Sequence, residues 1–144
     1  DFTYSTSITL SDVFTEVGDD RLLFIGPLIG SQVDIPESEY GRKSDIRMPC
    51  ARTYTTEMNI RIPSGYSVEG MSDLEGIVDN EAGAFVSQAY MSGKVLCIRT
   101  SKTYKRAFDK AENWPLMLEF LEAAYDFSKK KVLLKKLDSL AIPE

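Results

Sequence analysis

The chemistry open to this chain of 144 residues is limited first by the complete absence of histidine. Nucleophilic sites of the Cys–His and Ser–His–Asp types need an imidazole that accepts and returns a proton near neutral pH, and catalytic zinc sites commonly use imidazole ligands. Those chemistries are excluded within this chain. We therefore assign no catalytic, cofactor-binding or metal-ligating residue from the sequence, and we expect neither enzyme activity nor a cofactor.

The two cysteines, Cys50 and Cys97, either form a disulfide bond or remain separate thiols. They are too few for a tetrahedral structural zinc site, and they lack the Cys-x-x-Cys spacing of redox centres. A bridge would close a loop of about 47 residues and stabilise the fold by roughly 4 kcal/mol in the chain-entropy model. The alternation of Val95 and Cys97 on one strand face favours the other interpretation, a small buried hydrophobic side chain.

Acidic pairs offer a second kind of chemistry, at Asp19 and Asp20, Glu37 and Glu39, and Asp79 and Glu81. A glycosidase needs two carboxylates that face each other across a cleft, and nothing in the sequence arranges these pairs in that way. The segment Asp79-Asn80-Glu81 also lacks the length and ligand spacing of an EF-hand loop. A surface turn explains it better than a calcium site.

The candidate binding residues lie in and just after the segment 30–45, which is rich in Ser, Asp, Glu, Gly and Pro and is typical of a long surface loop. Such loops are commonly either mobile or binding elements. Tyr40 is its aromatic residue, and Arg42, Lys43 and Arg47 form a small basic cluster that either holds an anion or pairs with nearby carboxylates. Tyr40, Arg42 and Arg47 are therefore the predicted binding residues.

Composition and charge narrow the classes of partner. The chain has 17 Lys and Arg against 22 Asp and Glu, a net charge of −5, and 43% hydrophobic residues, which are the values of an ordinary globular domain. A net negative charge works against nucleic-acid binding, and no apolar run is long enough to cross a bilayer. The length predicts a single domain over 1–144. Because the chain starts at Asp1 without an initiator methionine, we expect this domain to be excised from a larger protein.

Alternation of apolar and polar residues predicts β-strands over most of the chain up to Phe108. The clearest runs from Tyr54 to Ile62, with one buried and one wet face, and the Ser92-Gly93 pair predicts a tight hairpin turn with positive φ at Gly93. The segment 73–83 is expected to be irregular. The predicted strands are 7–10, 21–25, 54–62, 66–68, 84–91, 94–100 and 102–108.

The apolar period changes to 3.6 residues from Trp114 onward and predicts one amphipathic helix over about 114–131. Asn113 is the expected N-cap, Pro115 suits the first turn, and Trp114 lies on the apolar arc, which favours core over a sugar-stacking platform. Val132 to Leu134 either returns as a strand or extends the helix. We predict an all-β fold, an immunoglobulin-like β-sandwich of about seven strands with this one C-terminal helix.

The order of motifs over residues 42–136 resembles one family. Arg47 and Pro49 precede the strand and turn Ile60-Arg61-Ile62-Pro63-Ser64-Gly65-Tyr66-Ser67-Val68-Glu69, which is the most specific motif. Asn80-x-x-Gly83-x-Phe85 follows, and Trp114-Pro115-Leu116-Met117-Leu118-Glu119-Phe120 leads to Val132-Leu133-Leu134-Lys135-Lys136. This order resembles the C-terminal domain of unknown function in Bacteroides-type transglutaminase-like proteins of the papain-like cysteine protease superfamily.

The resemblance implies a role as one part of a larger polypeptide. In that family the catalytic Cys, His and Asp belong to a preceding domain, so no catalytic role transfers to Cys50 or Cys97. The resemblance implies a non-catalytic accessory domain, periplasmic or cell-surface, that packs against the neighbouring catalytic domain and helps shape its substrate cleft. The alternative is an independent glycan- or peptide-binding module, in which the loop 30–45 and the turn 79–83 line a shallow site with Tyr40.

Overall fold

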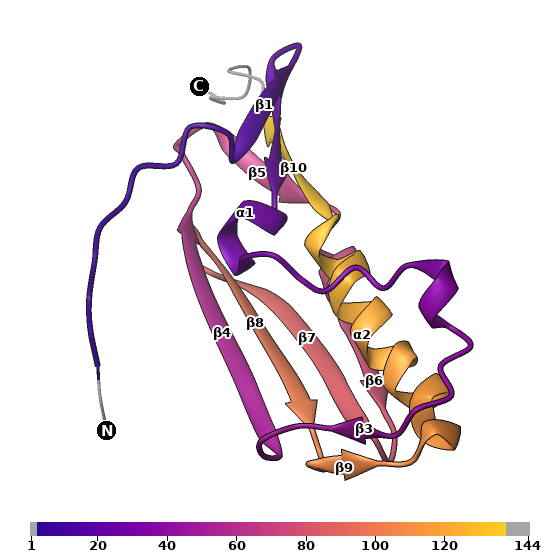
Figure 1. Cartoon of the computed structure of the whole chain (residues 1–144). Coiled ribbons are helices and arrows are strands. Elements are labelled where there is room, and N and C mark those ends of the chain that lie inside the picture. The colour runs from indigo at the N-terminus through magenta and orange to yellow at the C-terminus, as the bar shows by residue number, and fades with distance from the viewer. Residues whose placement is uncertain (1–2, 138–144) are drawn as a thin grey trace, which may run out of the picture.

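The computed structural model describes residues 3–137 and shows an elongated, mostly β protein with one long helix (Figure 1). Its elements, in chain order, are β1 (Phe14–Val17), β2 (Asp20–Phe24), α1 (Gly26–Ile29), η1 (Glu37–Glu39), β3 (Ile46–Arg47), β4 (Arg52–Arg61), β5 (Tyr66–Glu69), η2 (Met71–Leu74), β6 (Gly76–Asp79), β7 (Gly83–Ser92), β8 (Val95–Tyr104), β9 (Phe108–Asp109), η3 (Ala111–Asn113), α2 (Trp114–Ser128) and β10 (Lys131–Lys136).

The strands of the described region form three antiparallel sheets. The main sheet has the order β4-β8-β7-β6, and a second four-stranded sheet has the order β1-β2-β10-β5. Strands β3 and β9 pair as a short ribbon. Helix α2 crosses in front of β7 and β6 and leads directly into β10, so it connects the main sheet to the second sheet (Figure 1).

One face of the main sheet is buried under α2, as the alternation in the sequence predicts. Met58 on β4 pairs with Ile98 on β8, which pairs with Ala89 on β7, and all three side chains are buried. Their neighbours on the opposite face, such as Glu57 and Arg99, are exposed. The predicted one-sided burial of β4 is therefore confirmed.

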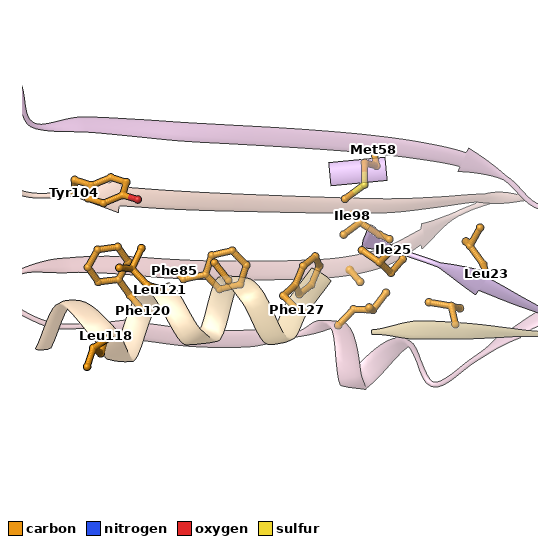
Figure 2. Packing of buried hydrophobic residues seen from close by; sticks show 14 of the residues in the cluster. Leu23, Ile25, Met58, Phe85, Ile98, Tyr104, Leu118, Phe120, Leu121 and Phe127 are labelled. Carbon is orange, nitrogen blue, oxygen red and sulfur yellow. The ribbon is translucent and has the colours of Figure 1, made fainter. Parts of the chain in front are cut away.

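Aromatic side chains join α2 to the main sheet. Phe120 and Phe127 of the helix are fully buried. Phe127 packs on Phe85 with ring centroids 5.5 Å apart, and Phe120 meets Tyr104 edge-on at 5.3 Å (Figure 2). Pairs with this geometry contribute about 0.5–1.5 kcal/mol each beyond the burial of their area. They fix the helix over β7 and β8.

The segment after α2 returns as the strand β10, the first of the two alternatives left by the sequence. Leu133 pairs with Leu22 on β2 and with Glu69 on β5, so β10 lies inside the second sheet. Val132 and Leu134 point into the core and are buried. The sequence also favours a frayed tail over 135–144; residues 135 and 136 instead belong to β10, and residues 138–144 lie outside the described residues.

The broad prediction of a mostly β chain with antiparallel sheets and one C-terminal helix is confirmed. The immunoglobulin-like sandwich of about seven strands is not confirmed, because residues 3–137 form ten strands in three sheets and α2 covers the main sheet where a sandwich would have its second sheet. Gly93 has the predicted positive φ, 59°.

Several local predictions were wrong, and each has a physical reason. Residues 7–10 form no strand, because no described strand pairs with them, whereas 76–79 of the expected irregular segment pair with β7. Helix α2 ends at Ser128 instead of residue 131, because β10 already begins at Lys131 and the chain must turn before it. The Asn113 side chain does not cap α2: its amide donates to the buried carboxylate of Asp109 at 2.9 Å.

Candidate functional site

The loop 30–45, a predicted binding element, is tied to helix α2 by side-chain hydrogen bonds. Trp114 Nε1 donates to the backbone oxygen of Glu39 at 2.8 Å, and Tyr125 Oη donates to Asp34 Oδ2 at 2.9 Å. A hydrogen bond to the Glu122 carboxylate, with burial and further acidic neighbours, raises the pKa of the Tyr40 hydroxyl. These contacts give the loop a structural role along the outer side of the helix.

Two of the three predicted binding residues share a surface cavity. Tyr40 and Arg42 line a hollow of about 320 Å³ between the loop and the start of α2. The Arg42 guanidinium lies over the Trp114 ring at 5.3 Å, and its Nε donates to the oxygen of Ser44 at 3.1 Å. Trp114 is only 5% exposed, which confirms the core interpretation of this residue.

The third predicted binding residue lies elsewhere. Arg47 is on β3, and its guanidinium stacks over Phe108 of the partner strand β9 at 5.0 Å. The turn 79–83 does not line the Tyr40 cavity. The shallow site predicted from the loop and this turn together is therefore not formed.

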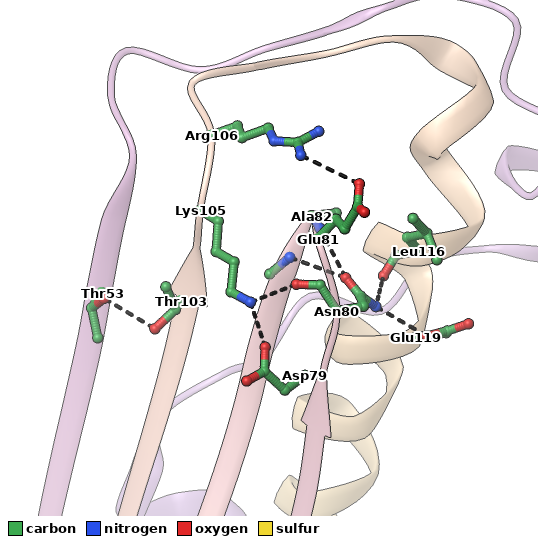
Figure 3. Close-up of polar contacts among 11 residues, drawn as sticks. Thr53, Asp79, Asn80, Glu81, Ala82, Thr103, Lys105, Arg106, Leu116 and Glu119 are labelled. Atoms are coloured by element: carbon green, nitrogen blue, oxygen red, sulfur yellow. Dashed lines mark hydrogen bonds and ion pairs between the residues drawn. The ribbon is translucent and has the colours of Figure 1, made fainter.

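The turn after β6 is instead a structural joint centred on Asn80 (Figure 3). Asn80 Oδ1 accepts hydrogen bonds from the backbone of Ala82 at 3.0 Å and of Gly83 at 3.1 Å. Its amide donates to the oxygen of Leu116 at 2.8 Å and to the Glu119 carboxylate at 3.0 Å, both on α2. One side chain thus closes the turn and fastens it to the helix.

Basic side chains support this joint from the segment that directly follows β8. Lys105 donates to the Asp79 carboxylate and to the backbone oxygen of Asn80, and Arg106 pairs with Glu81 at 3.4 Å (Figure 3). The acidic pair at 79 and 81 is therefore engaged with cations of the same protein, as the turn interpretation expects.

Both cysteines are free thiols, the second of the two alternatives. Cys97 is buried on β8 and pairs with Asn59 of β4, whereas Cys50 is exposed just before β4 begins. Arg52 and Asn59 are seven residues apart on that strand, which is roughly 23 Å at the usual rise per residue. A disulfide requires Cα atoms within about 7 Å, so the strand itself separates the two thiols.

A second candidate surface, which the sequence did not single out, lies on the helix-facing side of β4 and β8. Arg52 pairs with Tyr104 and Tyr54 pairs with Lys102, so the four side chains form a square with the cations on one diagonal and the tyrosines on the other. We call these four residues the Arg52–Lys102 patch. The rings of Tyr54 and Tyr104 meet edge-on at 6.5 Å.

The Arg52 guanidinium is enclosed by aromatic rings. It lies 5.5 Å from the centre of the Tyr54 ring and 5.3 Å from that of Tyr104. Its Nε is buried and has no hydrogen-bond partner among the described residues. Cation–π contact compensates for part of the lost hydration, but it leaves this N–H without an acceptor.

The Lys102 ammonium is half-buried on the other corner of the patch. It donates to Gln32 Oε1 at 2.7 Å and lies 5.9 Å from the centre of the Tyr54 ring. Burial, and then the positive charge of Arg52, lowers the pKa of Lys102. Both effects disfavour the charged amine, so the charged form of Lys102 lowers the stability of the folded protein.

A cavity of about 260 Å³ opens beside Lys102, between the main sheet and the segment that follows α1. Its lining includes Thr56 and Thr100, which carry hydroxyl groups, and the apolar residues Ile29 and Phe85. Thr100 is buried although its side chain is polar. The cavity thus brings together a cation, hydroxyl-bearing residues and apolar residues.

The patch could be found in the sequence only in part. Lys102 alternates with Tyr104 on the predicted strand 102–108, so the two side chains lie on the same face. If Tyr104 faces the core, the pattern also places the charge of Lys102 on that face. Arg52, however, lies before the predicted start of its strand, and only the β4–β8 register brings it next to Lys102.

Residues 3–137 contain neither a cluster of metal ligands nor a membrane-spanning helix. The acidic and cysteine side chains of this region form no group of three or more that could hold a metal ion. None of its helices has the length and apolar character needed to cross a membrane.

Comparison of the chain with family models, with curated proteins and with solved structures finds no match.

Proposed function

We propose that this chain is a non-catalytic accessory domain that packs against a neighbouring transglutaminase-like catalytic domain of the same polypeptide and helps shape its substrate cleft, outside the cytoplasm. The proposal begins from the order of motifs between residues 42 and 136. The structure supports it because the residues of those motifs stabilise the fold.

The contacts of the motif residues carry this proposal. Asn80 and Gly83 fasten the β6–β7 turn to α2, and Phe85 packs on Phe127. Val68, within the most specific motif, pairs with Leu134 on β10. These motif residues form turns, core contacts and strand pairs, which is the role of residues in a structural scaffold. A scaffold of this kind would contact a neighbouring catalytic domain through its surface.

The face of the main sheet opposite α2 offers the area that such packing needs. Most of its side chains are exposed, and they include Ile77 on β6 at 75% and Tyr90 on β7 at 56%. Ile77 pairs with the half-buried Val86. Interfaces between domains of one chain are mixed polar and apolar surfaces of this kind.

The first test is the full open reading frame. We expect a domain with a Cys–His–Asp set immediately upstream of Asp1, and a frame without one would contradict the proposal. The second test separates the two parts and measures their association. Ile77→Arg and Tyr90→Arg are expected to weaken it, whereas Val33→Arg, which adds the same charge to the exposed loop beside α2, is expected to leave it unchanged.

A second candidate function, an independent peptide- or glycan-binding module, is favoured by one observation, the cavity beside Lys102. This cavity replaces the predicted site at the loop and turn. Its volume of about 260 Å³ lies just below the roughly 300–1,000 Å³ of ordinary small-ligand pockets, so it suits a small group better than an oligosaccharide. Binding of a peptide or sugar by the isolated chain, with no effect on a catalytic domain, would favour this function over the accessory role.

A further inference from the structure

The Arg52–Lys102 patch holds two positive charges that the described part of the protein does not neutralise. No Asp or Glu of residues 3–137 forms an ion pair with Arg52 or Lys102. Within the described residues, the side-chain contacts of the two cations are with aromatic rings and one amide oxygen. Fully buried polar groups of lysine and arginine are normally paired, and the buried Arg52 Nε–H has no acceptor among the described residues, so this arrangement is incomplete by itself.

The two cations also repel each other. They occupy diagonal positions of neighbouring strands, where Cα atoms are about 7–8 Å apart. An anion between them would relieve that repulsion and would accept from the donors that remain, which are the guanidinium N–H groups of Arg52 and the Lys102 hydrogens not used by Gln32.

We propose that the Arg52–Lys102 patch is a binding site for a carboxylate group, with the chain that carries the carboxylate seated in the cavity beside Lys102. A carboxylate matches the guanidinium fork and accepts charge-assisted hydrogen bonds from an ammonium. Ile29 and Phe85 offer contact for the methylene groups of a glutamate side chain or a small dicarboxylic acid, and Thr56 and Thr100 offer hydroxyl groups.

The surroundings favour a carboxylate over a phosphate. Phosphate sites typically combine arginines with several backbone N–H groups at a helix N-terminus or a glycine-rich loop. Here the cations lie on the strands β4 and β8 and contact the ring faces of Tyr54 and Tyr104. This site does not depend on the accessory role proposed above, because either a neighbouring domain or a separate molecule can present the carboxylate.

The experiment is an NMR titration of the ¹⁵N-labelled chain at low ionic strength, with side-chain Nε–H signals of arginine included. The probes are the peptide acetyl-Gly-Glu-Gly-amide, its glutamine counterpart, glutarate and inorganic phosphate. We expect the glutamate peptide or glutarate to shift the Arg52 Nε–H signal and the amides around Lys102 and Tyr54. A stronger response to the peptide would identify a protein segment as the source, and a stronger response to glutarate a free acid.

The second part of the experiment repeats the titration with variants of the two cations. Lys102→Met and Arg52→Met are each expected to weaken binding about tenfold or more, as the loss of one charge-assisted hydrogen bond predicts. Arg99→Met removes a charge from the exposed face of the same strand β8 and is the matched control, expected to leave binding unchanged. If Arg52→Met does not fold, Arg52→Lys keeps the charge and removes the fork, and Lys102→Met still decides the question.

Four outcomes would overturn the proposal. They are no response to either carboxylate, an equal response to the glutamine peptide, equal weakening by Arg99→Met, and a response to phosphate at the patch without one to carboxylate. Because the measurement uses the chain alone, its failure would leave the accessory role standing, and a missing catalytic domain upstream would leave the carboxylate site standing.

Discussion

Gly83 lies so close to Phe120 that a β-carbon at position 83 would be 2.4 Å from the phenyl ring and 2.4 Å from the backbone oxygen of Thr103. Real atoms do not approach to this distance, so any side chain at Gly83 must displace the helix or the strand. This contact lets α2 lie directly on the end of β7, and it explains the glycine of the Asn80-x-x-Gly83 motif by packing alone.

Gly83→Ala is therefore expected to destabilise the protein by about 1–3 kcal/mol, the usual cost of overpacking a closed site. Urea unfolding followed by circular dichroism measures it. Gly41→Ala is the control, because no atom lies within 4 Å of a β-carbon there. Equal stability of the two variants would show that α2 does not rest on Gly83.

Asn80→Ala removes the side chain that joins the β6–β7 turn to α2. The backbone N–H groups of Ala82 and Gly83 and the oxygen of Leu116 lose their partner, so we expect a loss of about 1–3 kcal/mol in unfolding free energy. Asn80→Asp keeps the acceptor but loses the donor and adds a charge beside Glu119, so it should also destabilise. Native-state hydrogen exchange at the turn would check that the effect is local, and unchanged protection there would contradict it.

The thiols should react at different rates because they differ in burial. In denaturant without reductant, a thiol reagent should titrate two groups, since Cys50 and Cys97 are both free. In the native protein Cys50 should react rapidly and Cys97 slowly, limited by opening of β8. Cys50→Ser should remove the rapid phase only. A count of zero thiols in denaturant would mean that the two residues are bridged.

Lys102 predicts a pH dependence whose sign follows from its pKa. Burial, and then Arg52, lowers this pKa in the folded protein, so the unfolded chain binds more protons while Lys102 titrates. The Lys102 contribution to stability should rise with pH through this alkaline range and level off near the ordinary lysine pKa of about 10.4. Lys102→Met should be more stable than the parent at neutral pH.

The measurement for Lys102 is the difference in urea-unfolding free energy between the parent and Lys102→Met at a series of pH values from neutral to alkaline. The difference should favour the variant at neutral pH and shrink as pH rises. Taking the difference cancels the titration of Tyr40 and Tyr104, whose raised pKa values act at higher pH and in the opposite direction. A difference that stays constant or grows with pH would contradict the cost assigned to the charged lysine.

The linear pattern predicted the elements whose burial is periodic and long. The alternation from Tyr54 to Ile62 indicated β4 and its buried face, and the 3.6-residue period from Trp114 indicated α2. Short elements failed, because four residues such as those of β6 contain too little pattern to reveal pairing. Residues 7–10 have the composition of a strand but no partner among the described residues, and a strand exists only through its partner.

For the candidate site, the sequence determined which chemistry is absent and which residue types are present. Without histidine, the chain excludes imidazole-dependent catalysis, and its 17 Lys and Arg residues and 15 aromatic residues stand at known positions. The tertiary structure decided which of them meet. It placed Arg47 away from Tyr40 and the two cysteines far apart along β4. It also brought Arg52 next to Lys102 through the β4–β8 register, in which paired residues such as Thr53 and Thr103 are 50 positions apart in the sequence. Such contacts arise because backbone hydrogen bonding sets the register of strands over their whole length, and no local spacing encodes that register.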